Sequence, residues 1–282
     1  MKVTMTSSIV WSLDPLLYTT LPQSLIIDVI STVAFSRSVY ASLIGFSILY
    51  PTMHTILIKT FKKYRGIESS AKKIVILHHF MEFLFLSAIF PVFTYYVIRM
   101  FFQIHDIEAM RSNLISLFQL SMSMMTMYCF ELATRFENPR PMIVFHHLLA
   151  TLDGFLVLLF PSTTFMKTGA ILVYFICFEA IVFLGLFMYR VFPQSMITPR
   201  VIHFGMILFA CSRPLQLLLI IAIIKCSWGD QNFVMWHAII QIVFTVVLTA
   251  VQLWSVTIHY GILKKCKQNG KQEKILDAGS KC

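Results

Sequence analysis

Long runs of apolar residues, separated by short polar stretches, make up most of this chain. A helix needs about 20 mostly apolar residues to cross the hydrocarbon core of a bilayer. The polar segments between the runs are short and rich in turn-forming residues, as in "ENPRP" and "FPST". The stretch 25–35 is expected either to lie in the membrane interface or to lengthen the first helix. The pattern predicts seven membrane-spanning helices at 39–58, 74–98, 114–133, 141–160, 168–190, 201–224 and 235–262.

The composition agrees with a membrane protein. Of the 282 residues, 57% are hydrophobic and 13% are charged, and the mean hydropathy is +0.76. A soluble domain carries about 25% charged residues, so this chain is far from that balance. The 6 cysteines are scattered and imply no disulfide framework. We therefore expect an all-α polytopic membrane protein.

The excess of basic residues gives an orientation. The 23 Lys and Arg residues outnumber the 13 acidic ones, but most lie in short loops and in the C-terminal tail, so we expect no nucleic-acid binding. The loops on one side and the tail hold most of them, which predicts a cytosolic C-terminus and an N-terminus in the lumen of the endoplasmic reticulum. The predicted parts are 1–65, with the first span and a basic cytosolic loop, a transmembrane domain over 66–268, and a basic tail over 269–282.

Ionisable residues inside the predicted spans are the candidates for function. A charged group near the centre of a bilayer costs at least a few kcal/mol unless it faces a cavity or a partner. The stretch "FHHLLATLDGF" places His146, His147 and Asp153 in one of the most apolar spans. The pair His146 and His147 is the predicted catalytic group if the protein is an enzyme. The other candidates for lining a lipid cavity are His78, His79, Glu82, Glu131, Asp153, Glu179 and Arg213.

Helical geometry predicts some of the contacts of these residues. Arg213 is expected to pair with Glu179 or Asp153, because an unpaired charge at that depth is expensive. His147 points about 100° away from His146, so one of the two faces the interior and the other meets a neighbouring helix.

The histidines give only weak support for a metal-binding site. A His-His-x-x-Glu arrangement at 78–82 can hold a metal ion. The chain lacks the His-x-x-His-His boxes of di-iron enzymes, and we predict no metal site.

The order of these motifs resembles the TLC-domain family of endoplasmic-reticulum membrane proteins. The resemblance rests on "YCFELATRFENPRPMIVFHHLLATLDGFLVLLF", "YFICFEAIVFLGLFMYRVFP" and "FGMILFACSRPLQL", and covers about 66–268. The family includes the ceramide synthases, the translocation-associated membrane proteins and smaller lipid regulators. The matching positions are Tyr128 with Glu131, His146 with His147, Glu179, and Arg213.

The resemblance implies a ring of six helices around a lipid-sized cavity, with an additional N-terminal span. In ceramide synthases the paired histidines serve acyl transfer from acyl-CoA to a long-chain base. A histidine suits this step, because its pKa near 6.5 lets it accept a proton from an amine. This chain has Glu131 where that branch has an aspartate, and no His-Asp follows its histidine pair. It is therefore closer to the smaller, non-ceramide-synthase branch.

Three functions follow as hypotheses. The first is a protein without a cofactor that binds a membrane lipid or fatty acyl chain and influences lipid synthesis, composition or transport. The second is an acyltransferase that uses His146 or His147 with acyl-CoA as a substrate, and it requires a polar partner such as Asp153 or Glu179 facing the pair. The third is a seven-span receptor, although the last span contains no Asn-Pro-x-x-Tyr motif.

Overall fold

The computed structural model describes residues 24, 27–28, 31, 37–102, 107–135, 141–159, 163–228 and 235–279, and all regular structure in these residues is helical. The stretch 25–35 lies almost entirely outside them. The helices are α3 (Arg37–Thr60), α4 (Lys62–Arg65), α5 (Ser70–Phe102), α6 (Ile107–Thr134), α7 (Pro141–Leu159), α8 (Thr163–Ile176), α9 (Glu179–Val191), α10 (Ile197–Ser227) and α11 (Met235–Gly279).

Five segments are long and apolar enough to cross a membrane. They coincide with five of the seven predicted spans, which confirms a helical, multi-pass membrane protein. The other two predicted spans correspond to α6 and α7. The apolar part of α7, Pro141–Leu156, is shorter than the others, and α6 carries many polar residues along its 28 residues. The five segments are Val39–Thr60, Ser70–Arg99, Lys167–Val191, Ile197–Cys226 and Ala238–Cys266.

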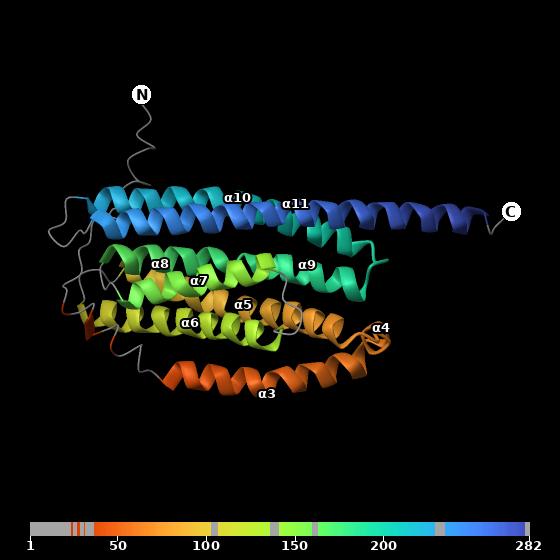
Figure 1. Ribbon diagram of the computed structural model, residues 1–282, viewed down its shortest axis with the longest axis horizontal. Helices are drawn as coiled ribbons and strands as arrows, with labels where there is room; N and C mark the ends of the chain where they lie inside the picture. The colour runs from red at the N-terminus through yellow and green to blue at the C-terminus, as the bar shows by residue number, and fades with distance from the viewer. Residues whose placement is uncertain are drawn as a thin grey trace, which may run out of the picture.

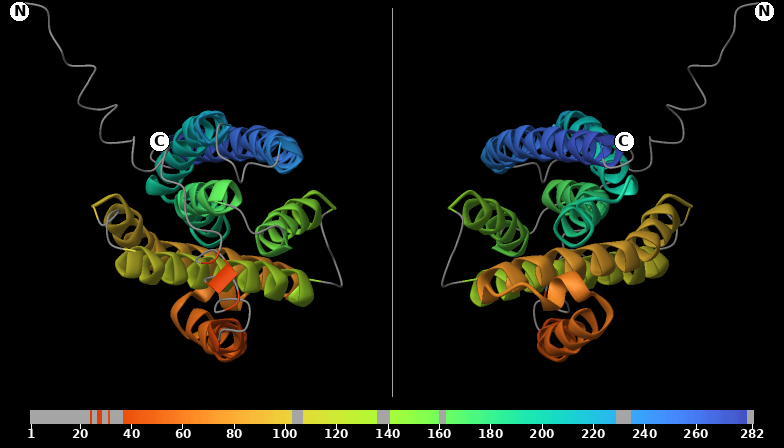
Figure 2. Two further views of the ribbon diagram at one scale, coloured as in Figure 1. Left: turned by 90° about the vertical axis from the view of Figure 1, so that its left-hand side faces the viewer. Right: turned by 90° about the vertical axis from the view of Figure 1, so that its right-hand side faces the viewer.

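The helices pack in a closed order. α5 packs against α6, α6 against α7, α7 against α11, α11 against α10, α10 against α9, and α9 returns to α5. α3 lies outside this order, mainly against α6. The end-on views show the α10–α11 pair on one side, α5 and α6 on the other, and α7, α8 and α9 between them (Figures 1 and 2). The interior of the bundle is therefore lined by helices from all parts of the chain after α4.

The predicted helix 168–190 is interrupted near its middle. α8 ends at Ile176 and α9 begins at Glu179, and the amide of Phe178 bonds to the carbonyl of Phe175, three residues back rather than four. No proline or glycine marks this position. α8 contacts α5, α6, α7, α10 and α11, so it fills the centre of the bundle at one end, whereas α9 packs mainly against α5 and α10.

Two glycines allow α9 and α10 to pack closely. A Cβ atom added at Gly185 would lie 3.3 Å from the Cα of Ile202, and one at Gly205 would lie 3.3 Å from the backbone carbonyl of Ile181. Small residues at such crossings are common in membrane helices, because packing rather than the hydrophobic effect holds them together. The close approach fixes α9 against α10 where both carry buried charges.

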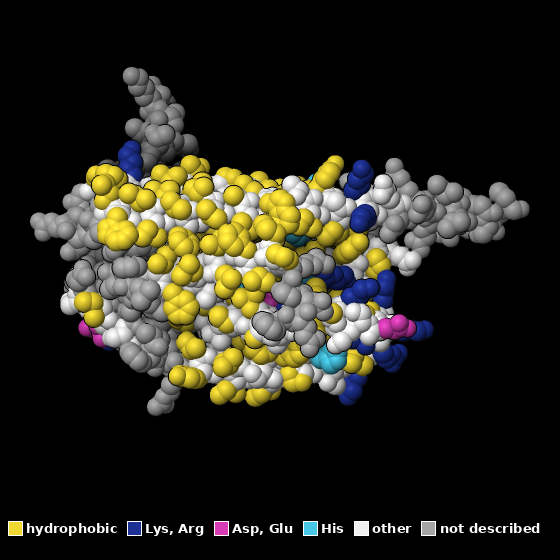
Figure 3. Space-filling view, in the orientation of Figure 1, with side chains coloured by type: hydrophobic (Ala, Val, Ile, Leu, Met, Phe, Trp, Pro, Cys, Tyr) yellow, Lys and Arg dark blue, Asp and Glu magenta, His cyan; other side chains and the backbone are white. Residues whose placement is uncertain are grey.

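The outer surface is apolar along the bundle and basic at one end. On α7 the exposed stripe consists of Phe145, Leu148, Leu152 and Phe155, at helical spacing. Figure 3 shows such side chains over one face of the bundle and Lys and Arg side chains gathered at one end. We call this the basic end. It contains Lys59, Lys62, Lys63, Arg65, Lys72, Arg200, Lys264 and Lys265, all of them exposed.

The last helix is longer than predicted. The sequence pattern ends the span at 262, but α11 continues without a break to Gly279 and is 45 residues long. Figure 1 shows its C-terminal part projecting past the other helices at the basic end. The apolar pattern ends where the membrane would end, whereas the backbone hydrogen bonding continues, because the following residues contain no proline.

Candidate functional site

The ionisable residues singled out in the spans lie inside the bundle, with one exception. None of the eight side chains in the list below is more than 5% exposed. His146 differs from them, because it is only partly buried. Of the histidine pair, His147 is therefore the one that faces the interior. The eight buried side chains are His78, His79, Glu82, Glu131, His147, Asp153, Glu179 and Arg213.

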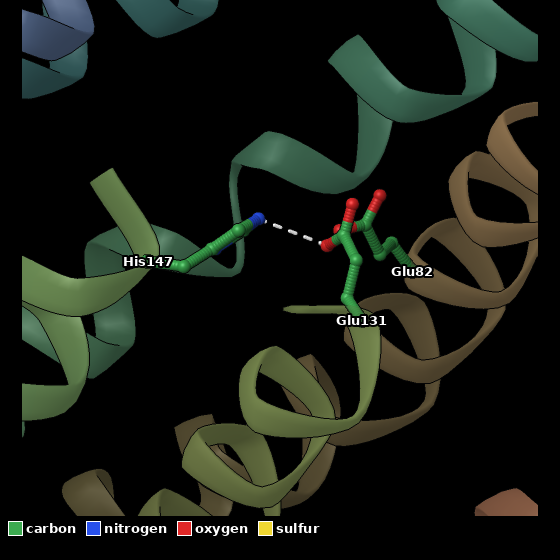
Figure 4. Close-up of side chains that lie close together, drawn as sticks. All are labelled: Glu82, Glu131 and His147. Carbon is green, nitrogen blue, oxygen red and sulfur yellow. Dashed lines mark ion pairs between the residues drawn. The ribbon is translucent and has the colours of Figure 1, made fainter. Parts of the chain in front are cut away.

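Three of these residues meet at one point, and we name them the carboxylate–histidine cluster. Glu82 comes from α5, Glu131 from α6 and His147 from α7. His147 Nε2 lies 2.9 Å from Glu131 Oε2, and one oxygen or nitrogen atom from each residue lies within 4.8 Å of the others. Figure 4 shows the Glu82 carboxylate beside that of Glu131, with the His147 ring pointing at Glu131. Two carboxylates and an imidazole thus converge from three helices.

The cluster is poorly satisfied by hydrogen bonds. Both oxygens of Glu82, and Oε2 of Glu131, are buried without a hydrogen-bond partner among the described residues. Arg135 Nη1 lies 2.6 Å from Glu131 Oε1, one helical turn away. His79 Nδ1 is 3.8 Å from Glu82 Oε2, which is too far for a hydrogen bond. Buried polar groups without a partner are unusual, so Glu82 requires an explanation.

The two histidines on α5 have other contacts. His78 Nε2 lies 2.6 Å from the hydroxyl of Thr134, at the end of α6. His79 Nδ1 lies 3.4 Å from Arg135 Nη2. Consecutive residues on a helix point about 100° apart, so His78, His79 and Glu82 do not converge on one atom. His78, His79 and Glu82 therefore do not form a group of metal ligands among the described residues.

An aromatic ring covers the imidazole of the cluster. The ring of Tyr128, one turn before Glu131 on α6, lies 4.5 Å from that of His147 and 6.2 Å from that of His146, measured between ring centroids. Tyr128 is 1% exposed, and its hydroxyl has no hydrogen-bond partner among the described residues. The ring limits the orientations that His147 can take.

A second group of buried polar residues has its charges paired, and we name it the paired cluster. Arg213 on α10 donates to Glu179 Oε1 at 2.6 Å and to Gln216 Oε1 at 2.7 Å. Gln252 on α11 donates to the same Glu179 oxygen at 3.1 Å. The ring of Phe209 lies 4.4 Å from the guanidinium carbon of Arg213. The predicted pairing of Arg213 is thus met by Glu179, and the paired cluster joins α9, α10 and α11.

Asp153 is bound away from the histidines. The side-chain amide of Gln241 donates to its Oδ1 at 3.0 Å. Asp153 and Glu179 were the expected partners of the histidine pair, but Gln241 and Arg213 bind them instead. The residue that approaches His147 is Glu131, from the neighbouring helix.

A buried polar stripe on α11 was missed by sequence reasoning. Gln241, Thr245, Thr249 and Gln252 are all 6% exposed or less. Their spacing of four, four and three residues places them on one helical face. This spacing was the available signal, but uncharged polar residues in an apolar run attract less attention than charged ones.

A small apolar cavity lies between α6, α7 and α8. Its volume is about 30 Å³, room for about one or two water molecules. Methionines 122, 124 and 125 of α6 form one wall, and Tyr128 and Asp153 also line it. Tyr128 therefore separates the cavity from His147.

The carboxylate–histidine cluster could bind a cation, hold an imidazole as a general base, or accept hydrogen bonds from a polar headgroup. Comparison of the chain with protein-family models, curated proteins and solved structures finds no match in any of the three. The choice among these functions therefore depends on the geometry of the site.

Proposed function

We propose that this chain is a TLC-type membrane protein that takes a lipid or fatty acyl chain into its helical bundle and influences lipid synthesis, composition or transport. The observation that carries the proposal is the apolar cavity that ends at Tyr128, the residue whose ring packs against His147. An acyl chain in this cavity would place its polar end at the carboxylate–histidine cluster. The motif order of the sequence and the closed packing order of the helices support the family assignment.

The proposal includes seven spans, with α6 and α7 crossing the membrane beside the five apolar segments. Their 28 and 19 residues correspond to about 42 and 28 Å of helix, close to or above the thickness of the hydrocarbon core. The polar residues of α7 face inward and its apolar stripe faces out. By the positive-inside rule the basic end faces the cytosol and the N-terminus faces the lumen of the endoplasmic reticulum.

Loading of a lipid requires the cavity to expand. At about 30 Å³ the cavity is much smaller than an acyl chain. Its wall of methionines is adaptable, because the unbranched thioether side chain has three rotatable bonds. α7 is shorter than α5, α6, α10 and α11, and its Gly154 lies against Met125 of α6. In this proposal α7 moves outward, Met125 swings aside, and the cavity lengthens toward His147.

A test uses two glycine variants of the full chain, purified in mild detergent. In Gly154→Ala the added Cβ would overlap Met125 Sδ, so Met125 is pushed into the cavity. Gly45→Ala is the matched control, because an added Cβ there meets no atom within 4 Å. Mass spectrometry after organic extraction should show a defined lipid in the parent and the control, and several-fold less in Gly154→Ala. Equal lipid in all three, or no enriched lipid in the parent, would contradict the proposal.

A second candidate is an acyltransferase, favoured by the contact between Glu131 and His147. The carboxylate lies 2.9 Å from Nε2, and Nδ1 has no hydrogen-bond partner among the described residues. A carboxylate that orients an imidazole in this way raises its ability to accept a proton from an amine, with acyl-CoA as the donor substrate. Intact-protein mass spectrometry discriminates the two candidates. A covalent acyl adduct on His147, lost in His147→Ala, would indicate the enzyme, and a released lipid without an adduct would indicate the binding protein.

A further inference from the structure

The carboxylate–histidine cluster contains an excess of buried acceptors that the proposed lipid function does not explain. Asp153 has its bond from Gln241, and Glu179 has its bonds from Arg213 and Gln252. Glu82 is 1% exposed, yet neither of its oxygens has a hydrogen-bond partner among the described residues. A buried carboxylate without a partner is strongly unfavourable, so the site lacks a positive charge or a donor.

The positive charge or hydrogen-bond donor that Glu82 lacks would lie at a defined position. Arg135 contacts Glu131 at Oε1, the oxygen turned away from His147. The other oxygen, Oε2, lies 2.9 Å from His147 Nε2, but the geometry does not satisfy a hydrogen bond. Glu82 lies on the other side of this oxygen (Figure 4). Glu82, Glu131 and the Nε2 atom of His147 therefore face one another, and no other described residue donates a hydrogen bond to Glu82 or to this oxygen of Glu131.

We propose that Glu82, Glu131 and His147 form a binding site for a divalent metal ion of the zinc type. Two carboxylate oxygens and one imidazole nitrogen are ligands that Zn²⁺ prefers, at about 2.0 to 2.2 Å. Around a tetrahedral ion such ligands are roughly 3.4 Å apart. The three atoms already lie within 4.8 Å of one another. Side-chain rotations that move these atoms by about 1 Å would place all three at bonding distance from one ion.

The surroundings suit a metal ligand set. Arg135 holds the outer oxygen of Glu131, and Tyr128 packs against the ring of His147, so both ligands are oriented from behind. Three protein ligands leave a fourth position for water, as in catalytic rather than structural zinc sites. Arg135 pairs with Glu131, so the charge that a Zn²⁺ ion would offset is that of Glu82.

The test measures metal binding directly, on the full chain without a polyhistidine tag, in mild detergent. The protein is treated with EDTA, dialysed against Zn²⁺ and freed of unbound ion, and the bound zinc is counted by elemental analysis. We expect about one Zn²⁺ per chain, and a visible absorption band of tetrahedral geometry when Co²⁺ replaces it. Glu82→Gln should weaken Zn²⁺ binding by 10-fold or more. Asp153→Asn, the same change at a buried carboxyl group outside the site, should bind Zn²⁺ as the parent does.

Either of two results would overturn the proposal. One is a parent protein that takes up no more Zn²⁺ or Co²⁺ than empty detergent micelles, which would assign the unsatisfied acceptors to a proton shared between Glu82 and Glu131. The other is a Glu82→Gln variant with unchanged affinity. Extraction of lipid from the same samples separates this proposal from the previous one, because loss of zinc with retained lipid would remove the metal site and leave the lipid function standing.

Discussion

The two buried clusters contain similar residues but differ in how their charges are balanced. In the paired cluster, Arg213 and Gln252 both donate to Glu179, and three helices are joined through one carboxylate. In the carboxylate–histidine cluster, two carboxylates and an imidazole converge, and no N–H or hydroxyl group of the described residues donates to Glu82. Removing one partner from a paired cluster leaves a buried charge and is strongly destabilising, whereas an unbalanced cluster reduces stability and is retained for what it binds. Opposite stability effects on mutation should therefore distinguish the two.

The largest effect is expected for Arg213→Met. The substitution removes the arginine that pairs with Glu179 and leaves its carboxylate buried, which costs about 3 to 5 kcal/mol. The change should appear as a strong fall in thermal stability, followed by tryptophan fluorescence in detergent. The double variant with Glu179→Gln should recover part of the loss, because no buried charge then remains unpaired. If Arg213→Met alone is as stable as the parent, the paired cluster does not stabilise the packing of the three helices.

A smaller loss, about 1.5 kcal/mol, is expected for Gln252→Leu, because it removes one hydrogen bond to a buried carboxylate. Thr249→Val is the matched control on the same face of α11. Its hydroxyl has no hydrogen-bond partner among the described residues, so its removal should leave the melting temperature nearly unchanged. Equal losses in the two variants would mean that general packing of α11, rather than the bond to Glu179, is being measured.

The opposite sign is expected for Glu82→Gln, measured in EDTA so that no metal contributes. Neutralising a carboxylate that lies beside Glu131 and has no hydrogen bond should raise stability by about 1 kcal/mol or less. The melting temperatures of the variant and the parent in the same EDTA buffer decide the point. A marked destabilisation would show that Glu82 is balanced by a partner within the bundle and that the two clusters are alike.

The smallest effect is expected at the surface, for Asp28→Asn. Asp28 forms an exposed ion pair with Arg111, which holds the pKa of the Asp28 carboxyl below its usual range. A lowered pKa contributes stability above the unfolded value of about 3.9, and the contribution is lost as the pH falls through the folded value. The variant should melt slightly below the parent at pH 6, and the difference should become smaller as the pH falls below about 3.9. A constant difference over this pH range would indicate an effect unrelated to charge.

The paired cluster could be predicted from the sequence more fully than the carboxylate–histidine cluster. Arg213 is an arginine deep in an apolar span, so its need for a carboxylate at similar depth points to Glu179 or Asp153. Depth follows from the rise of about 1.5 Å per residue, which a sequence reveals once the helix ends are known. The rotation of each helix about its axis does not follow in this way. The approach of Glu131 to His147, and of Glu82 to Glu131, depends on that rotation.

The interruption between α8 and α9 also could not be predicted from the sequence. The stretch "YFICFEAIVF" reads as one apolar helix, and neither proline nor glycine marks the turn at Cys177 and Phe178. The interruption depends on tertiary packing, because α8 occupies the centre of the bundle while α9 packs between α5 and α10. The helical class and five of the seven spans followed from hydrophobic run lengths, since run length against bilayer thickness is a local property.

The part of α11 that projects past the other helices offers a rigid attachment point for a fusion partner in single-particle imaging. A chain of 32.5 kDa with few features outside the membrane gives particles that are hard to align. α11 continues unbroken from Ala238 inside the bundle to Gly279, well past the last predicted apolar residue at 262. Because the rise of the helix is fixed at about 1.5 Å per residue, a small soluble protein fused in helical register would hold a constant orientation relative to the bundle. Such a fiducial would show whether α7 also takes the outward position proposed for the lipid-loaded protein.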